Sequence, residues 1–153
     1  ADPVAALPEF EAVYKAAAEK FGGINSGNIG VGSTIFAVKP GDGSAREQAA
    51  SCQKVLGGWA NIANEYATKR YRSNLINWGM LPFIIEEGAL PFSNGDYIFI
   101  PDIRKAVEYK ATDIEAYVAS AEGLKPIALT LGELTDDERE IILKGCLINY
   151  NRK

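Results

Sequence analysis

The residues best suited to chemistry lie close together between positions 41 and 46. Ser44 and Arg46 follow two glycines, Gly41 and Gly43, where a short apolar run ends and a helical pattern begins. Backbone N–H groups exposed after such a turn, together with the positive end of a helix dipole, favour a bound anion. The planar guanidinium of Arg46 suits bidentate binding of a carboxylate, and positive potential around Ser44 favours its deprotonated form, which can act as a base. The pattern indicates binding of a small polycarboxylate and base chemistry on it.

The same residues also have a purely structural interpretation. The glycines form a turn, Ser44 is the N-cap of the following helix, and Glu47 completes a Ser-x-x-Glu capping box. Arg46 is then a solvated side chain, and replacing Ser44 by alanine removes a cap worth about 1 kcal/mol. From the pattern alone, this structural interpretation is favoured over the functional one.

The counts of histidine and cysteine exclude several kinds of active site. The chain has no histidine and only two cysteines, Cys52 and Cys146. A serine–histidine or cysteine–histidine pair is therefore excluded, and two distant cysteines cannot by themselves supply a zinc or iron–sulfur site. We expect both cysteines to be small buried residues in a reducing compartment, without a disulfide. Any metal used in the reaction must be bound by something other than this chain.

Length and charge are typical of an acidic globular domain. The 153 residues, 47% of them apolar and 24% charged, predict one domain with a real core. The net charge of −4 disfavours binding to nucleic acid. No apolar run approaches the roughly 20 residues of a membrane-spanning helix, and the first residues lack a signal-peptide pattern. We expect a single cytoplasmic domain over residues 1–153, with neither nucleic acid nor membrane as a partner.

Alternating strand and helix patterns predict an α/β domain that presents residues 41–46 between a strand and a helix. Early alternation favours parallel pairing through βαβ connections, whereas the later strands include a hairpin. The predicted strands cover residues 35–38, 59–66, 81–85, 97–100, 116–121 and 126–131, and the predicted helices cover residues 10–21, 49–56, 68–78, 103–109 and 135–150.

Three local expectations accompany these elements. Asp102 is expected to cap the helix that follows it, and Thr135 with Glu138 forms a capping-box pattern at the start of the last helix. The basic run from Lys69 to Arg72 is expected to be a solvated helix face rather than a site for a polyanion.

Residues 41–50 resemble a motif of the aconitase superfamily. Their sequence, Gly-Asp-Gly-Ser-Ala-Arg-Glu-Gln-Ala-Ala, is similar to Gly-x-Gly-Ser-Ser-Arg-Glu-His-Ala-Ala in the swivelling C-terminal domain of that family. Residues 56–58 and 74–82 look like two further family segments, Leu-Gly-Gly and Asn-Leu-x-x-x-Gly-Leu-Leu-Pro. The resemblance implies an aconitase-type swivelling β/β/α domain with a mixed sheet and flanking helices. Such a domain closes over a larger unit that carries a four-iron–four-sulfur cluster.

The resemblance also implies roles for individual residues. Ser44 matches the catalytic base of the family, which takes a proton from the carbon next to a carboxylate, and Arg46 matches a substrate-binding arginine. Gly43 and Ala45 are expected to contribute to substrate binding beside it. The cluster iron, on the larger part, acts as a Lewis acid on the substrate hydroxyl. This chain is thus expected to bind no metal or cofactor itself, and its partners are a cluster-binding large domain or subunit and a small polycarboxylate.

The sequence departs from the family pattern near the site. Ala45 replaces the second serine of the motif, Gln48 replaces its histidine, and residues 65–68 read Glu-Tyr-Ala-Thr in place of Ser-Phe-Ala-Arg. No arginine precedes Arg46, although the family usually has a substrate-binding arginine upstream. Either that segment lies outside this chain or the substrate differs.

The leading hypothesis is a hydro-lyase domain that reversibly dehydrates and rehydrates a hydroxy di- or tricarboxylate. The chain is expected to be a C-terminal domain of a larger hydratase or a separate small subunit, and to be inactive without its cluster-binding partner. One alternative is the small subunit of a 3-isopropylmalate dehydratase-type isomerase. Another is a non-catalytic, regulatory module that keeps the fold and binds carboxylates.

Overall fold

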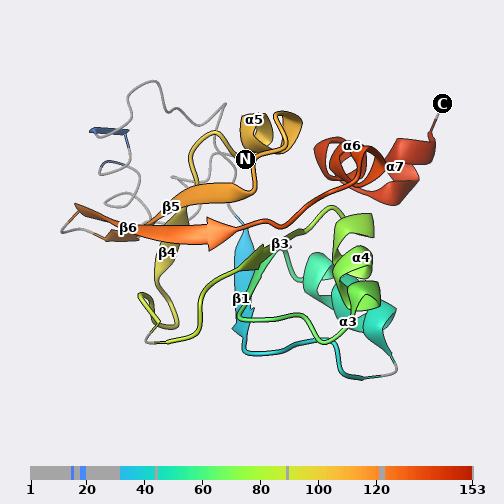
Figure 1. Ribbon diagram of the computed structural model, residues 1–153, viewed down its shortest axis with the longest axis horizontal. Coiled ribbons are helices and arrows are strands. Elements are labelled where there is room, and N and C mark those ends of the chain that lie inside the picture. The colour runs from blue at the N-terminus through green and yellow to red at the C-terminus, as the bar shows by residue number, and fades with distance from the viewer. Residues whose placement is uncertain are drawn as a thin grey trace. The chain divides into compact units, whose positions relative to one another are not determined.

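The structure is a computed structural model that describes residues 15, 18–19, 32–43, 45–88, 90–120 and 123–152 of the chain (Figure 1). At residues 46, 47 and 120 it describes the backbone alone. The helix predicted over residues 10–21 lies outside the described part, except for residues 15, 18 and 19, which are helical. The helices and strands are β1 (Ser33–Ala37), α3 (Arg46–Val55), β2 (Gly58–Ala63), α4 (Lys69–Asn77), β3 (Leu81–Ile84), β4 (Tyr97–Phe99), α5 (Ile103–Glu108), β5 (Asp113–Ser120), β6 (Gly123–Thr130), α6 (Asp136–Lys144) and α7 (Leu147–Asn151).

The strands form a mixed sheet in the order β1-β2-β3-β6-β5-β4. Strands β1, β2 and β3 pair in parallel, whereas β3 pairs antiparallel with β6 and β4 pairs antiparallel with β5. This sheet with its flanking helices confirms the predicted α/β class, including parallel pairing in the first half and antiparallel strands in the second. Strands β5 and β6 are neighbours joined by two residues, as expected for the predicted hairpin.

Contacts along the chain define two compact units. One comprises Ala1–Val31, Gly88–Pro101 and Glu115–Ala128, and the other comprises Gly32–Glu87, Asp102–Ile114 and Leu129–Lys153. We call the second the α/β unit, because it holds β1, β2 and β3 with their connecting helices. It also contains residues 41–46 and therefore positions the candidate site.

The three parallel strands of the α/β unit end at the same edge of the sheet. Parallel strands need a crossover, which α3 supplies between β1 and β2 and α4 supplies between β2 and β3. At the carboxyl ends, Ala37 is paired with Ala63, and Ala63 is paired with Ile84. The loops that follow the three strands consequently lie beside one another, and residues 41–46 belong to the first of them.

The core of the α/β unit lies between this sheet and its helices. Helices α3 and α4 lie side by side and pack against β2 and β3 (Figure 1). A cluster centred on α4 joins Tyr71, Leu75 and Met80 to Ala50 on α3, and all four are at most 2% exposed. Tyr71 and Leu75, four residues apart, share one face of this helix, and both are buried.

The C-terminal segment is two helices rather than the single helix predicted over residues 135–150. Helix α6 begins with the predicted capping box, in which Thr135 Oγ1 accepts from the Glu138 backbone N–H and the Glu138 carboxylate accepts from the Thr135 N–H. It ends at Gly145, which has φ 93° in the left-handed region, so the helix cannot continue. The apolar pattern runs on through α7, but among its residues and Cys146 none is buried.

One other local prediction is only partly correct. Asp102 is indeed the N-cap position of α5, but it has φ 52° and makes no side-chain capping hydrogen bond. Its carboxylate lies 4.0 Å from Lys105 Nζ instead.

Cysteine burial was predicted wrongly. Cys52 is exposed and Cys146 is half-buried, and both thiols are free. Both Ala50 and Cys52 lie on α3, and the buried Ala50 marks the face of the helix that points into the core. Residues two positions apart do not share a helix face, so Cys52 points away from the core. Within the described residues, no helix has the length and apolar character needed to cross a membrane.

Candidate active site

The loop that carries the predicted site leaves β1 at Ala37 and enters α3 at Arg46. We call residues 41–46 the serine loop. Gly43 and Ala45 are exposed, and Ala45 is the N-cap of α3, with φ −89°, ψ 48° and no side-chain capping hydrogen bond. The N-cap is therefore one residue later than the predicted Ser44. The side chains of Ser44 and Glu47, which would form the predicted capping box, lie outside the described part of the chain.

The two side chains that matter most for chemistry are outside the described part of the chain. Ser44 lies outside it altogether, and Arg46 is described only as the first residue of α3. Their roles as base and carboxylate ligand remain predictions. The structure places the backbone on both sides of them at the amino end of a ten-residue helix, where N–H groups and the helix dipole favour an anion.

Backbone hydrogen bonds join the serine-loop region to the loop after β2. The N–H of Glu65 donates to the carbonyl of Val38 at 3.1 Å, and the N–H of Ala67 donates to the carbonyl of Pro40 at 3.0 Å. The chain just before Gly41 is thereby fixed to the loop that leads into α4. This ladder continues the β1–β2 pairing past the ends of the strands.

The loop after β3 is fixed to the loop after β2 in a similar way. The N–H of Ile85 donates to the carbonyl of Ala63 at 2.9 Å. The side-chain amide of Asn64 donates to the carbonyls of Ile85 and Glu86 at 3.1 and 3.3 Å. All three loops at this edge are thus hydrogen-bonded to one another, which is how a scaffold positions loops that carry function.

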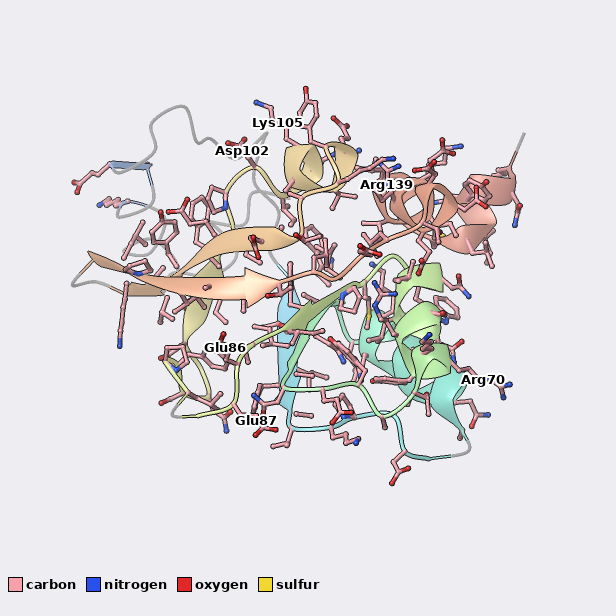
Figure 2. All side chains as sticks on the ribbon, in the orientation of Figure 1. Arg70, Glu86, Glu87, Asp102, Lys105 and Arg139 are labelled. Atoms are coloured by element: carbon pink, nitrogen blue, oxygen red, sulfur yellow. The ribbon has the colours of Figure 1, made fainter. Side chains whose placement is uncertain are left out.

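The described charges at this edge are mainly negative. In the described parts of the three loops (residues 38–43, 64–68 and 85–88), Lys39 is the one basic residue, and its Nζ forms an exposed ion pair with Glu65 at 3.0 Å. The acidic residues Asp42, Glu86 and Glu87 are exposed as well. Figure 2 shows Glu86 and Glu87 at this end of the strands, far from the basic side chain of Arg70. A polycarboxylate held here needs cations beyond those of the described loops.

A buried polar cluster lies beneath the loop. The hydroxyl of Tyr71, on α4, accepts from Gln53 Nε2 on α3 at 2.8 Å and from Asn61 Nδ2 on β2 at 3.4 Å. Asn61 is only 2% exposed, and its Oδ1 and Gln53 Oε1 lack a hydrogen-bond partner among the described residues. Sequence reasoning missed Asn61 and Gln53. An asparagine inside the apolar run of β2 was the available signal, because buried polar residues need a reason to be there.

Tyr66 adds a second buried hydroxyl to this region. Its hydroxyl donates to the carbonyl of Phe83 at 2.9 Å and to that of Asn61 at 3.3 Å, and its ring lies 6.4 Å from that of Tyr71. Burial raises the pKa of Tyr66 well above its ordinary value, and the neighbouring Tyr71 raises it further, while Arg72 lowers it. Tyr66 is therefore a neutral donor that braces the strand ends rather than a candidate base.

A cavity lies elsewhere in the α/β unit. It has a volume of about 260 Å³ and is bounded by the end of α5 and the segment leading into α6. Its charged lining residues, Lys110, Glu133 and Arg139, are of both signs, so it does not attract anions as a group. Of the predicted site residues, the described Gly43 and Ala45 do not line it. Figure 2 shows Arg139 on α6, close to α5.

The described residues do not fit a metal centre. They contain no group of three or more His, Cys, Asp or Glu side chains placed to hold a metal ion. Cys52 on α3 and Cys146 before α7 are the only cysteines of the chain, whereas an iron–sulfur cluster takes several thiolates. The ligand set for such a cluster is therefore not supplied by these two residues.

Comparisons with known proteins identify the family. The family model described as the aconitase C-terminal domain matches residues 27–88, which include the serine loop. The crystal structure of 3-isopropylmalate dehydratase (LeuD) from Methanocaldococcus jannaschii is similar, with 30% sequence identity and a TM-score of 0.56 over 90% of this chain and 75% of that one. Among the curated proteins, none matches. The agreement of fold, motif and sequence shows that this chain belongs to the aconitase superfamily, in the family of its swivelling C-terminal domain.

Proposed function

We propose that this chain is the swivelling domain of a hydro-lyase that reversibly dehydrates and rehydrates a hydroxy di- or tricarboxylate. The observation that carries the proposal is the position of the serine loop. It lies within the family match, at the carboxyl edge of three parallel strands and at the amino end of α3. Ligands of open α/β sheets bind at that edge, and a helix amino end favours carboxylates.

Within this proposal the loop residues divide the chemistry between them. Ser44 removes the proton from the carbon next to a carboxylate, and returns it in the reverse reaction. Arg46 binds the carboxylate with two parallel hydrogen bonds, which fixes that carbon beside the serine. The backbone N–H groups of Gly43 and Ala45, both exposed, complete the carboxylate site.

A second polypeptide or domain completes the active site in this proposal. The cysteines of this chain do not supply the ligands of a four-iron–four-sulfur cluster, so the cluster belongs to a cluster-binding large domain or subunit of the same enzyme. The described loops at the strand edge are mainly acidic, so the partner also supplies cations for the remaining carboxylates. The isolated chain is therefore inactive.

The similarity to LeuD favours one substrate class within the proposal. That protein is a 3-isopropylmalate dehydratase, and the match covers three quarters of its chain. A small subunit acting on 3-isopropylmalate is therefore the second candidate. Ala45 and Gln48, which replace a serine and a histidine of the family motif, support the alternative of a non-catalytic carboxylate-binding module.

The test is the turnover of the assembled enzyme after replacement of Ser44. The full chain is combined with its cluster-loaded large partner, and dehydration is measured with citrate-type acids and with isopropylmalate. Ser44→Ala is expected to lower kcat by about 100-fold or more, because a positioned base contributes at least that much.

Ser51→Ala is the matched control. Ser51 lies in α3 and its hydroxyl donates to the carbonyl of Gln48 at 3.1 Å, away from the proposed chemistry. This variant is expected to retain wild-type turnover. Full activity of Ser44→Ala would show that Ser44 is not the base. Binding of a carboxylate by the isolated chain, without turnover in the assembly, would favour the non-catalytic module.

A further inference from the structure

We infer that Tyr71 is a positioning residue that holds the serine loop at both of its ends. This inference rests on the proposed function, because a positioning role has meaning only if Ser44 reacts. Tyr71 is 2% exposed, so it does not touch substrate itself. Its contacts, however, reach the chain before Ser44 and the helix after it.

The first contact is made by the ring of Tyr71 with Gly41. A Cβ at position 41 would lie 2.5 Å from both Cβ and Cγ of Tyr71, closer than any side chain tolerates. Gly41 also has φ 97°, a conformation that glycine adopts without strain. The loop therefore starts from a point where its backbone rests directly on the tyrosine. Gly43, two residues later, has no atom within 4 Å of such a Cβ.

The second contact is made by the hydroxyl of Tyr71 with α3. Gln53 Nε2 donates to this hydroxyl at 2.8 Å, and Gln53 lies two turns into the helix that begins at Arg46. Ala50, which is fully buried on the same helix, belongs to the core cluster of Tyr71. Tyr71 thus contributes to the orientation of α3, and with it to the direction of its amino end, in addition to the packing of α3 on α4 and β2.

Two further contacts fix Tyr71 itself. Its backbone N–H donates to Thr68 Oγ1 at 3.1 Å, in the N-cap of α4. Asn61 Nδ2 lies 3.4 Å from its hydroxyl, which ties the tyrosine to the middle of the sheet. Rotation of the Asn61 amide by half a turn would turn this contact into a hydrogen bond from the hydroxyl to Oδ1. In either orientation the ring is prevented from swinging away from Gly41.

A core role and a positioning role predict different results for Tyr71→Phe. The variant keeps the ring against Gly41 and loses only the hydroxyl, with its contacts to Gln53 and Asn61. If the tyrosine is merely core, stability falls and the folded enzyme turns over normally. If it positions the loop, kcat falls about tenfold or more while KM changes little, because displacement of a catalytic group by about 1 Å can cost two orders of magnitude.

The experiment compares Tyr71→Phe with Tyr150→Phe in the assembled enzyme. Tyr150 is the matched control, since its hydroxyl also makes a side-chain hydrogen bond in the α/β unit, to Asp137 Oδ1 at 2.9 Å, but it lies on α7 and takes no part in the contacts of the serine loop given above. We expect lowered kcat for Tyr71→Phe, wild-type kcat for Tyr150→Phe, and no additional loss when Tyr71→Phe is added to Ser44→Ala. Normal kcat in folded Tyr71→Phe would overturn the inference.

A second readout does not depend on activity. Amide hydrogen exchange of residues 41–46 in the full chain is expected to rise about tenfold in Tyr71→Phe and to stay unchanged in Tyr150→Phe. Unchanged exchange in Tyr71→Phe would overturn the positioning role even if no substrate were found. If Ser44→Ala keeps activity while exchange rises in Tyr71→Phe, the proposed function fails and the role of Tyr71 in ordering the loop stands.

Discussion

The backbone of Gly79 lies directly against the backbone of Gly145, so that the ends of α4 and α6 touch without side chains between them. A Cβ on residue 79 would stand 1.8 Å from the carbonyl oxygen of Gly145. Both glycines have positive φ, 75° and 93°. This contact joins α4, which carries Tyr71, to the C-terminal helices.

Gly79→Ala is therefore expected to destabilise the chain by about 3 kcal/mol or more, because overpacking against an immobile carbonyl adds to the strain of a positive φ. Urea unfolding followed by circular dichroism measures the change. Gly57→Ala is the matched control, since Gly57 has φ 87° but open space around its Cβ position. It should cost about 1 kcal/mol. Equal losses in the two variants would mean that the Gly79 contact is unimportant.

Arg72 provides a second link between α4 and the segment that begins α6. Its Nη2 donates to the carbonyl of Glu133 at 2.9 Å, and its Nη1 lies 3.5 Å from the carboxylate of Glu138. Arg72→Lys is expected to cost about 1 kcal/mol in urea unfolding, because an ammonium cannot make both contacts of the guanidinium fork. Arg70→Lys, an exposed change on the same helix, should be neutral. If Arg72→Lys left stability unchanged, a positive charge alone would be enough at this position and the two guanidinium contacts would not matter.

The elements of the fold were largely predictable because their signals are local. Short apolar runs located the strands from β1 to β6, and helical periodicity with Thr135 and Glu138 located α4 and α6. The break after α6 was missed, since apolar residues continue at helical spacing into α7. The available signal was Gly145, which follows Lys144 and ends the helix with φ 93° in the left-handed region.

The motif of the candidate site could be predicted from the sequence, but the buried residues that hold the loop in place could not. Ser44 and Arg46 stand out by type and spacing, whereas Gln53, Asn61 and Tyr71 come from three different elements and meet only through packing. Arg72 was expected to be a solvated side chain together with its basic neighbours. It is half-buried instead, because it contacts Glu133 and Glu138. These partners lie far away in sequence, so the local pattern could not indicate them.

Arg46→Lys tests the carboxylate ligand of the proposed function. Lysine keeps the positive charge but loses the two parallel hydrogen bonds, so kcat/KM of the assembled enzyme should fall about tenfold or more, mainly through KM. Steady-state kinetics measures both constants. Arg70→Lys again serves as the control, because it makes the same exchange on the exposed face of α4. Unchanged kinetic constants in Arg46→Lys would remove this residue from the substrate site.

Asp136 gives the chain an acid-dependent contribution to stability. Hydrogen bonds from Lys110 and then from Arg139 hold the pKa of its carboxyl below the ordinary value, and Lys110 Nζ lies 3.2 Å away. Because the folded chain prefers the ionised form, this contribution is present above the unfolded pKa of about 3.9 and is lost as the pH falls through the lower folded value. Asp136→Asn should therefore be less stable than the wild type near neutral pH and equal to it in strong acid, as measured by urea unfolding across that range. Asp113→Asn, an exposed change at the start of β5, controls for loss of one negative charge. A stability difference between Asp136→Asn and the wild type that stays constant with pH would contradict the expected role of the ionised carboxylate.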